Sequence, residues 1–145
     1  MDFKIRKIKK EDKLGVIEMM RVFYSSDAVF TSGSDEIFES DVDECLSDSP
    51  FLTGYVFELG EELAGYAMTA HSFSTEFGKP CVWIEDLYIK EEYRGRGIGT
   101  AFFAFVENEY PTALLRLEAE TENRGAIALY EKCGFSCLPY LEMKK

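Results

Sequence analysis

The stretch that decides the fold is Trp83-Ile84-Glu85-Asp86-Leu87-Tyr88-Ile89, followed after Lys90 to Tyr93 by Arg94-Gly95-Arg96-Gly97-Ile98-Gly99-Thr100. The first part is an apolar run that predicts a strand. After the glycines, apolar residues recur at helical spacing up to Pro111, at Ile98, Phe102, Phe105 and Val106. A helix N-terminus leaves N–H groups unpaired and carries partial positive charge, and glycines let that backbone come close to an anion. The stretch therefore predicts a strand–turn–helix unit that binds an anion such as a pyrophosphate.

The glycine spacing excludes two familiar nucleotide sites. A dinucleotide fingerprint, G-x-G-x-x-G, needs a third glycine where Thr100 stands, and it should follow the first strand of a fold rather than a later one. A Walker A loop needs Gly-Lys-Ser/Thr, which this turn lacks. A plain turn at a helix start is the structural alternative, but glycines at alternate positions there lower stability without return unless they serve a ligand.

Outward from this unit, the pattern predicts one mixed α/β domain over residues 1–145. The expected strands are 3–8, 52–59, 63–73, 81–89, 113–119 and 135–143. The expected helices are 11–24 with Leu14, Ile17 and Met20 inward, one from the N-cap Ser34 to before Pro50, one from 98 to before Pro111, and 123–133. Gly60-Glu61 is expected to turn a hairpin. This order fits a sheet with an antiparallel middle and a crossover near its end, and not repeating βα units.

The composition describes one globular domain with a strong negative charge. The 145 residues are 46% hydrophobic and 30% charged, with a formal net charge of −11. This charge argues against nucleic acid as a partner, and no apolar run approaches the roughly 18 residues of a membrane span. Irregularly spaced cysteines and the lack of a signal-peptide pattern favour the cytoplasm. No cluster has metal-ligand spacing, so we expect no metal.

The acidic residues are unevenly placed along the chain. Between Val22 and Gly78 there are 12 acidic residues and no Lys or Arg. One interpretation is a solvated face that keeps the protein soluble, and the other is a negative field that gathers a cationic substrate. His71 is the only histidine; it lies in a strand pattern without a suitable partner, so we expect it to be structural.

Two motifs resemble signatures of the GCN5-related N-acetyltransferases (GNAT), a superfamily that uses acetyl-CoA. Arg94-x-x-Gly97-x-Gly99 resembles the R/Q-x-x-G-x-G/A motif, and the segment from Asn123 to Phe135 resembles N-x-x-A-x-x-L-Y-x-K-x-G-F. The predicted element order matches along essentially the whole chain. Residues 84–89 with 93–95 are most similar to the diamine and polyamine (spermidine/spermine) acetyltransferase branch. The resemblance implies a mixed sheet with helices on both faces and a splayed pair of strands at the cofactor site.

The resemblance also implies where acetyl-CoA would bind as co-substrate. Backbone amides of the glycine turn would hold the pyrophosphate, with the Arg94 and Arg96 side chains adding charge. The pantetheine arm would pair with the preceding strand, and Asn123 would hydrogen-bond the same region. The residues expected at the cofactor are Leu87, Tyr88, Ile89, Arg94, Gly95, Arg96, Gly97, Ile98, Gly99, Thr100, Asn123 and Tyr130.

Tyr130 corresponds to the family's proposed general acid, which protonates the CoA thiolate as it leaves. An ordinary tyrosine pKa of about 10 keeps its proton at neutral pH, which suits that role. The spacing of Tyr130 with Ala126, Leu129 and Cys133 also fits a purely structural aromatic residue in the core.

Glu85 resembles the family's acidic residue that serves as general base or substrate anchor. Period-two alternation places it on one strand face with Trp83 and Leu87, opposite to Asp86. A surface carboxylate without a role, or a chain of water molecules as base, are the alternatives. A carboxylate near apolar Trp83 could have a raised pKa and be a better base.

The expected reaction is direct transfer of acetyl to a primary amine. Tyr24 and Asp27 fall in the acidic stretch, in a loop that lines the acceptor side in the family, so a cationic acceptor is expected: a polyamine, a diamine or a lysine-like amine. Acetylation of protein lysines or N-termini is an alternative, and a non-catalytic CoA-binding or regulatory module is an alternative of another class. Relatives commonly dimerise, and 12 Phe with 8 Tyr leave apolar surface for a homodimer.

Overall fold

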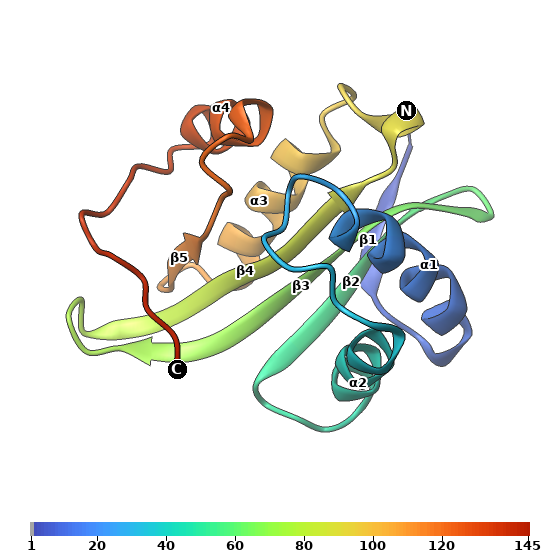
Figure 1. The fold of residues 1–145 in the computed structure, drawn as a ribbon, viewed down its shortest axis with the longest axis horizontal. Coiled ribbons are helices and arrows are strands. Elements are labelled where there is room, and N and C mark those ends of the chain that lie inside the picture. Colours follow the sequence, from blue (N-terminus) through green and yellow to red (C-terminus); the bar gives the residue numbers. More distant parts are fainter. Residues whose placement is uncertain (1) are drawn as a thin grey trace.

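A five-stranded mixed sheet forms the centre of the computed structural model, which describes residues 2–145. The strands lie across the sheet in chain order (Figure 1). They are β1 (Lys4–Lys7), β2 (Leu52–Leu59), β3 (Glu62–Ser74), β4 (Lys79–Ile89) and β5 (Leu114–Leu117). β1 to β4 pair antiparallel, whereas β5 runs parallel to β4. The predicted mixed sheet is confirmed, as is the hairpin turn at Gly60, which has a φ of 63°.

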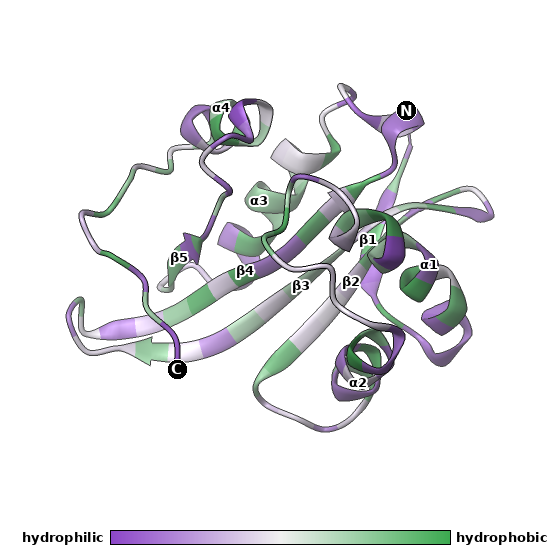
Figure 2. Cartoon of the chain, in the orientation of Figure 1, coloured by the Kyte–Doolittle hydropathy of each residue, from purple (hydrophilic) through white to green (hydrophobic). Residues whose placement is uncertain are grey.

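Helices cover both faces of the sheet, as expected. They are α1 (Lys13–Tyr24), α2 (Asp35–Leu46), α3 (Ile98–Glu109) and α4 (Arg124–Lys132), with short 3-10 turns at Lys10–Asp12 and Glu91–Tyr93. α1 and α2 pack on one face, in a core that contains Met20 and Val42, and α3 packs on the other around Phe102. Figures 1 and 2 show this arrangement and the mixture of hydrophobic and hydrophilic residues along α1 and α2. None of the described helices is long and apolar enough to cross a membrane.

Side chains cap α2 and α4 at their N-termini. Ser34 accepts a hydrogen bond from the N–H of Ile37 at 3.3 Å, which confirms it as the N-cap of α2. Asn123 does the same for α4, where its Oδ1 accepts from the N–H of Ala126 at 3.3 Å. Each cap pairs an N–H group that the first turn of a helix otherwise leaves free, so both helix starts are fixed locally by sequence.

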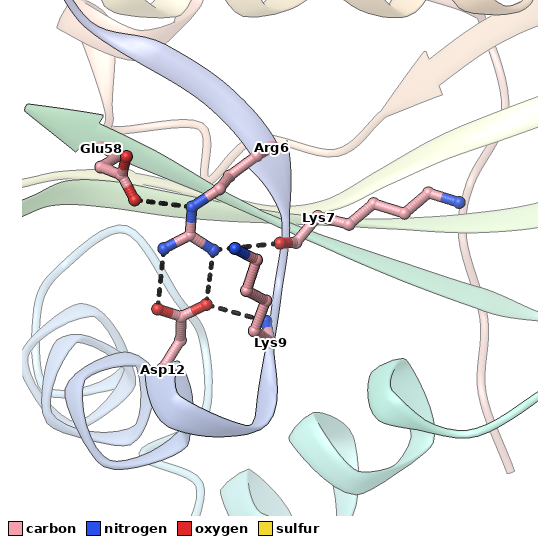
Figure 3. A network of polar contacts seen from close by, with 5 residues as sticks. All are labelled: Arg6, Lys7, Lys9, Asp12 and Glu58. Atoms are coloured by element: carbon pink, nitrogen blue, oxygen red, sulfur yellow. Dashed lines mark hydrogen bonds and ion pairs between the residues drawn. The ribbon is translucent and has the colours of Figure 1, made fainter.

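Arg6 ties the edge strand β1 to its neighbours (Figure 3). Its guanidinium donates to both carboxylate oxygens of Asp12, at 2.7 and 3.0 Å, and its Nε donates to Glu58 of β2 at 2.7 Å. The side chains of Arg6 and Asp12 are only 14% and 9% exposed. The hydrogen bonds from Arg6 hold the pKa of Asp12 below its usual range. A two-pronged, largely buried pair of this kind is stronger than an exposed ion pair.

Basic residues near the N-terminus neutralise part of the acidic stretch. Glu58 pairs with Arg6, as described above. In addition, Asp43 pairs with Lys13 at 2.8 Å, and Asp35 pairs with Arg21 at 2.9 Å. Both pairs join α1 to α2 or to its first turn. These carboxylates therefore serve the fold, and a field for a cationic substrate has to come from other members of the stretch.

The expected last strand, 135–143, is wrong. These residues follow α4 without regular structure: Phe135 is half-buried, and the exposed remainder runs back toward the β3–β4 turn (Figure 1). Pro139 has no N–H to give to a strand ladder, so it interrupts the pairing that the apolar alternation predicted. The segment is held instead by a hydrogen bond from the Tyr140 hydroxyl to Glu76.

The expected inward face of the first helix is also partly wrong. Leu14 is 78% exposed, whereas Val16, Ile17, Met19 and Met20 are buried. The four buried residues place the inward face of α1 on the side of the helix away from Leu14. The helix itself begins after a 3-10 turn, two residues later than expected.

Candidate active site

The site is built where β4 and β5 separate. Their pairing covers only Cys81–Ile84 and Leu114–Leu117. From residue 85 to residue 89, β4 has no partner strand on this side within the described chain, which confirms the splayed pair. A cavity of about 1170 Å³ occupies the opening. Its lining includes Tyr24, Asp27, Glu85, Leu87, Tyr88, Ile89, Arg94, Gly95, Asn123 and Tyr130.

The glycine turn has the backbone shape that an anion site needs. Gly95 and Gly97 have φ values of 74° and 84°, a region that favours glycine, and no atom lies within 4 Å of where a Cβ would stand on either residue. Gly97 is the N-cap of α3 and has no side chain to cap the helix. The first N–H groups of α3 are therefore left for a ligand, and the open space is compatible with a pyrophosphate.

Other residues of the motif serve packing. Ile98 is buried in the core below α3, and a Cβ on Gly99 would stand 3.0 Å from Leu129, so Gly99 lets α3 and α4 approach each other. The lining of the cavity reaches Arg94 and Gly95 but does not include residues 96–100. In this motif, Arg94 and Gly95 line the cavity, whereas Ile98 and Gly99 pack α3 against the core and α4.

The two arginines of the turn are held by aromatic rings. Arg94 donates from Nε to the carbonyl of Ile89 at 2.8 Å, and its guanidinium lies 5.8 Å from the centre of the Tyr88 ring. The Arg96 guanidinium lies 5.5 Å from the Tyr93 ring. Both contacts keep positive charge beside the turn while the rest of the protein is acidic.

The open edge of β4 is suited to an extended ligand. Leu87, Tyr88 and Ile89 pair with β3 on one side, and their backbone faces the cavity on the other. An unpaired strand edge can add one more extended chain through main-chain hydrogen bonds. Asn123 lines the same cavity with its carbonyl oxygen engaged as the cap of α4, so its NH₂ group is the part that can reach a ligand. These residues fit the pantetheine arm of CoA.

Tyr130 is positioned by the end of α4. Gly134, at φ 97°, donates its N–H to the carbonyl of Glu131, and the N–H of Phe135 bonds to the carbonyl of Tyr130 itself. These two bonds form a Schellman motif, which turns the Phe135 ring back toward the helix. Phe103 and Phe135 then contact the Tyr130 ring edge-on, at 5.8 and 6.2 Å between centres.

Tyr130 is thus both packed and exposed to ligand space. It lines the first cavity and also a second cavity of about 1060 Å³ that lies between β5 and the C-terminal segment. Burial raises the pKa of its hydroxyl, so the group keeps its proton at neutral pH. The aromatic contacts explain why the ring is packed, and the residue also lines both cavities.

A β-bulge changes the expected orientation around Glu85. Met68 of β3 pairs with Asp86 and Thr69 pairs with Ile84, so Glu85 is an extra residue in β4. Ile84 and Leu87 consequently both belong to the core under α3, although they are three residues apart. Trp83 and Leu87 therefore do not share a face, and the prediction that Glu85 lies on one face with both is wrong. Simple alternation fails because a bulge inserts one residue.

The two neighbouring carboxylates of β4 lie in different surroundings. Glu85 lines both cavities, whereas Asp86 is only 4% exposed and lies inside the protein. Asp86 accepts hydrogen bonds from the Tyr66 hydroxyl at 2.6 Å and from the Tyr24 hydroxyl at 2.9 Å. Burial raises the pKa of Asp86, and the two phenols act in the opposite direction by stabilising its charged form.

Several carboxylates perturb one another around this point. The Glu85 carboxyl stays in contact with solvent at the mouth of the cavities, and its pKa is raised by partial burial and by the charges of Asp86 and Glu142. Burial and the charges of Asp86 and Glu85 raise the pKa of Asp41, on α2, to about 6. A hydrogen bond with Glu142, burial and nearby charges raise the pKa of Glu118 to about 7. The region is strongly negative, which favours a positively charged ligand.

The segment between α1 and α2 forms the opposite wall of the first cavity. Tyr24 ends α1, and Asp27 follows in the segment that crosses the sheet in Figure 1. Both line the cavity together with Glu85, so the predicted acceptor residues are brought together. His71 lies elsewhere: its Nε2 is 3.0 Å from the Thr53 hydroxyl, its ring contacts Tyr110, and it lines neither cavity.

Sequence reasoning missed three carboxylates of this region. Asp41 has no distinctive motif, but it sits on the inward side of α2, one position before buried Val42, and that position was a usable signal. Asp86 was taken only as the residue facing away from Glu85. Glu118 directly follows β5 and lines both cavities; the sequence offers no signal for its contact with Glu142, because the two are separated by α4.

Comparison with known proteins agrees with this architecture. A thialysine N-epsilon-acetyltransferase from Sus scrofa is 29% identical over 146 aligned positions, which cover 90% of this chain and 82% of that protein. The Bos taurus protein of the same name is 36% identical over 78 residues; the match covers 52% of this chain and 45% of that protein, less than half of its length.

Solved structures share the fold at low sequence identity. A possible acetyltransferase from Clostridium difficile 630 superposes with a TM-score of 0.83 at 20% identity, covering 99% of this chain and 96% of its own. The aminoglycoside acetyltransferase AAC(6')-Iy, solved with a bisubstrate analogue that contains CoA, gives a TM-score of 0.82 at 15% identity and covers 100% and 98%. The family model described as the acetyltransferase (GNAT) family matches residues 17–135 of this chain. The chain therefore belongs to the GNAT family of acetyltransferases.

Proposed function

We propose that this acetyltransferase transfers the acetyl group of acetyl-CoA directly to the primary amine of a small cationic acceptor. The observation that carries the proposal is that one cavity is lined by the open edge of β4, the start of the glycine turn at Arg94 and Gly95, Tyr130 and Glu85. Glu85 lines that cavity, and the charge of the neighbouring Asp86 helps to raise the pKa values of both Glu85 and Asp41, so the negative field there favours an ammonium group.

The comparisons support an amine acceptor of this class. The two curated relatives are named for an N-epsilon amine of thialysine, and AAC(6')-Iy is named for aminoglycosides. Polyamines, diamines and lysine-like amines have in common a primary amine and positive charge. Their charge complements the site, whereas an acidic acceptor would be repelled.

The residues divide the reaction between two proton transfers. Bound acetyl-CoA supplies the thioester carbonyl carbon that the amine attacks. The Glu85 carboxylate takes a proton from the attacking amine, directly or through water, and its raised pKa makes it a stronger base than an ordinary glutamate. The Tyr130 hydroxyl gives its proton to the departing sulfur. The amide groups of the glycine turn and the edge of β4 bind and orient, and Arg94 adds positive charge beside the turn.

Thiol release from acetyl-CoA tests the proposal. The wild-type protein is assayed with spermidine, 1,5-diaminopentane, lysine, thialysine, a lysine-containing peptide and an aminoglycoside, with Tyr130→Phe as the matched control. We expect the highest kcat/KM with one of the small cationic amines. Turnover confined to the peptide would assign a protein acceptor instead. Binding of CoA in calorimetry without turnover of any amine would support a non-catalytic CoA-binding module.

A cytoplasmic location and a homodimer complete the proposal. The dimer is favoured by large apolar side chains at the surface, such as Phe51 at 68% and Phe73 at 63% exposure. Sedimentation velocity over a range of protein concentrations tests it, and a single monomeric species throughout would contradict it.

A further inference from the structure

The buried carboxylate of Asp86 accepts hydrogen bonds from two tyrosine hydroxyls. Tyr24, Tyr66 and Asp86 come from α1, β3 and β4, and the bonds measure 2.9 and 2.6 Å. Tyr66 is completely buried and Asp86 is 4% exposed, while Tyr24 is partly buried and lines the first cavity. One buried carboxylate therefore connects a cavity wall with the interior of the sheet.

The direction of the Tyr24 hydrogen bond follows from the chemistry of the pair. A phenol has one O–H donor and lone pairs that accept, and an ionised carboxylate can only accept. The single proton of Tyr24 is therefore directed at Asp86, and what its oxygen can offer the cavity is a lone pair. The Tyr66 hydroxyl donates its proton to the other oxygen of Asp86. Both carboxylate oxygens therefore have a tyrosine donor, and the carboxylate is held in one orientation.

Aromatic packing holds the Tyr24 ring in this position. Phe23 and Phe38 lie 5.3 and 5.2 Å from its centre, and Phe23 also contacts Tyr66 at 6.4 Å. The ring cannot turn away without losing these contacts, so the oxygen stays in one place beside Asp86, on a residue that lines the cavity. A fixed acceptor costs a ligand little ordering free energy when it binds.

From this arrangement we infer that Asp86 is a positioning residue, which locks the Tyr24 hydroxyl as a hydrogen-bond acceptor and so makes this wall selective for ligands with N–H donors. The inference rests on the proposed function, because it assigns the acceptor amine to the same cavity. It adds a source of selectivity that charge alone does not give: a primary ammonium satisfies the oxygen of Tyr24, whereas a quaternary ammonium of equal charge has no N–H to donate.

Calorimetry with a pair of ligands tests the inference. The protein is saturated with CoA, which cannot react, and titrated with 1,5-diaminopentane or with its bis-trimethylammonium analogue, which has the same charge and no N–H. We expect the wild type to bind the diamine more tightly, and Tyr24→Phe to weaken diamine binding about tenfold while changing analogue binding less than about twofold. Asp86→Asn should reduce the same preference, since an amide NH₂ can donate to Tyr24 and free its proton to turn toward the cavity.

Tyr66→Phe is the matched control, because it removes the other hydrogen bond to Asp86 without touching the cavity. It should leave the ratio of the two affinities within about twofold of wild type, since the Tyr24 bond persists. Adding Asp86→Asn to Tyr24→Phe should not lower the preference for the diamine over its analogue any further than Tyr24→Phe does alone. CoA affinity checks that each variant is folded; the Tyr→Phe pair decides the question if Asp86→Asn does not fold.

Three results would overturn the inference: no binding of the diamine to wild type, an unchanged preference in Tyr24→Phe, or an equal loss in Tyr66→Phe. The last would show that the network acts only by supporting the fold. Failure of the proposed function has a different signature. If the diamine binds with the expected pattern but releases no thiol from acetyl-CoA, transfer to this amine is wrong while the role of Asp86 stands.

Discussion

Asp41→Asn removes a carboxylate whose charge opposes folding. Burial on α2, together with the charges of Asp86 and Glu85, raises the pKa of Asp41 from 3.8 to about 6. A carboxyl whose pKa is higher in the folded than in the unfolded protein favours folding while it is protonated, and this contribution is lost as the pH rises through the folded pKa. In wild type, the ionised Asp41 therefore lowers the free energy of unfolding by its full amount above about pH 6 and not at all below about pH 4.

The size of the effect follows from the difference between the two pKa values. About two pH units, at about 1.4 kcal/mol each, give an upper bound of about 3 kcal/mol. Because Asp41 keeps some contact with solvent, we take roughly 1–2 kcal/mol after screening. For a chain of this size, 1 kcal/mol moves Tm by roughly 3 °C, so the variant should melt roughly 3–6 °C higher near neutral pH.

Thermal melts followed by circular dichroism at about pH 7.5 and about pH 4.5 measure this gain, which should shrink at the lower pH. Asp43→Asn is the control on the same helix, since Asp43 is paired with Lys13 and should give no gain. The stabilised variant should also bind cationic acceptors more weakly, because one charge of the site is gone. A Tm that does not rise at the higher pH, or that rises equally at both, would refute the reasoning.

Three further substitutions test the reaction itself. Tyr130→Phe should lower kcat by about 100-fold while acetyl-CoA affinity stays within about twofold, because only a proton donor is lost; an unchanged rate of thiol release would remove Tyr130 from the mechanism. Gly97→Val should weaken CoA binding at least about tenfold, since φ 84° strains a β-branched residue. Calorimetry measures this, and Gly78→Val, also at a positive φ (65°) but in the β3–β4 turn at the other end of β4, should bind CoA normally. Wild-type kcat/KM should fall as the pH drops through the raised pKa of Glu85, because the protonated carboxyl cannot accept a proton. Glu85→Gln should be slow without this acidic limb, and persistence of the limb would place the base elsewhere.

Most of the fold could be predicted because its signals are local. Ser34 caps its helix, Gly60 turns its hairpin, and Gly134 ends α4, each through a backbone requirement that few other residues meet. The apolar spacing of α3 placed Phe102 correctly for the same reason. The sheet order then follows the general tendency of successive strands to lie side by side.

What could not be predicted depends on contacts between distant parts of the chain. The bulge at Glu85 exists only in the pairing of β3 with β4, so no pattern within β4 reveals it. The C-terminal segment alternates like a strand, but its pairing depends on what the neighbouring edge accepts and on Pro139. Leu14 shows the same limit, since the burial of one helix face is decided by how α1 packs on the sheet and on α2.

The site was predictable to the extent that it is made of backbone. The glycine turn, the cap at Asn123 and the end of α4 are all encoded within a few residues, and the first cavity is lined by the start of that turn and by Asn123. The carboxylates were harder to predict, because burial and the charge of Asp86 raise the pKa of Asp41, and burial raises that of Asp86, whereas sequence spacing shows neither effect.

The single-residue bulge in β4 also bears on how such a protein can diverge. Glu85 is the inserted residue and faces the cavities, whereas Asp86 next to it is bound to two tyrosines of the interior. Mutations at position 85 can therefore alter what the protein accepts at little expense in stability, while position 86 is constrained by the fold. Adjacent codons thus differ greatly in mutational tolerance. New acceptor preferences are expected to arise first at position 85, because this residue has no partner in the pairing of β3 with β4.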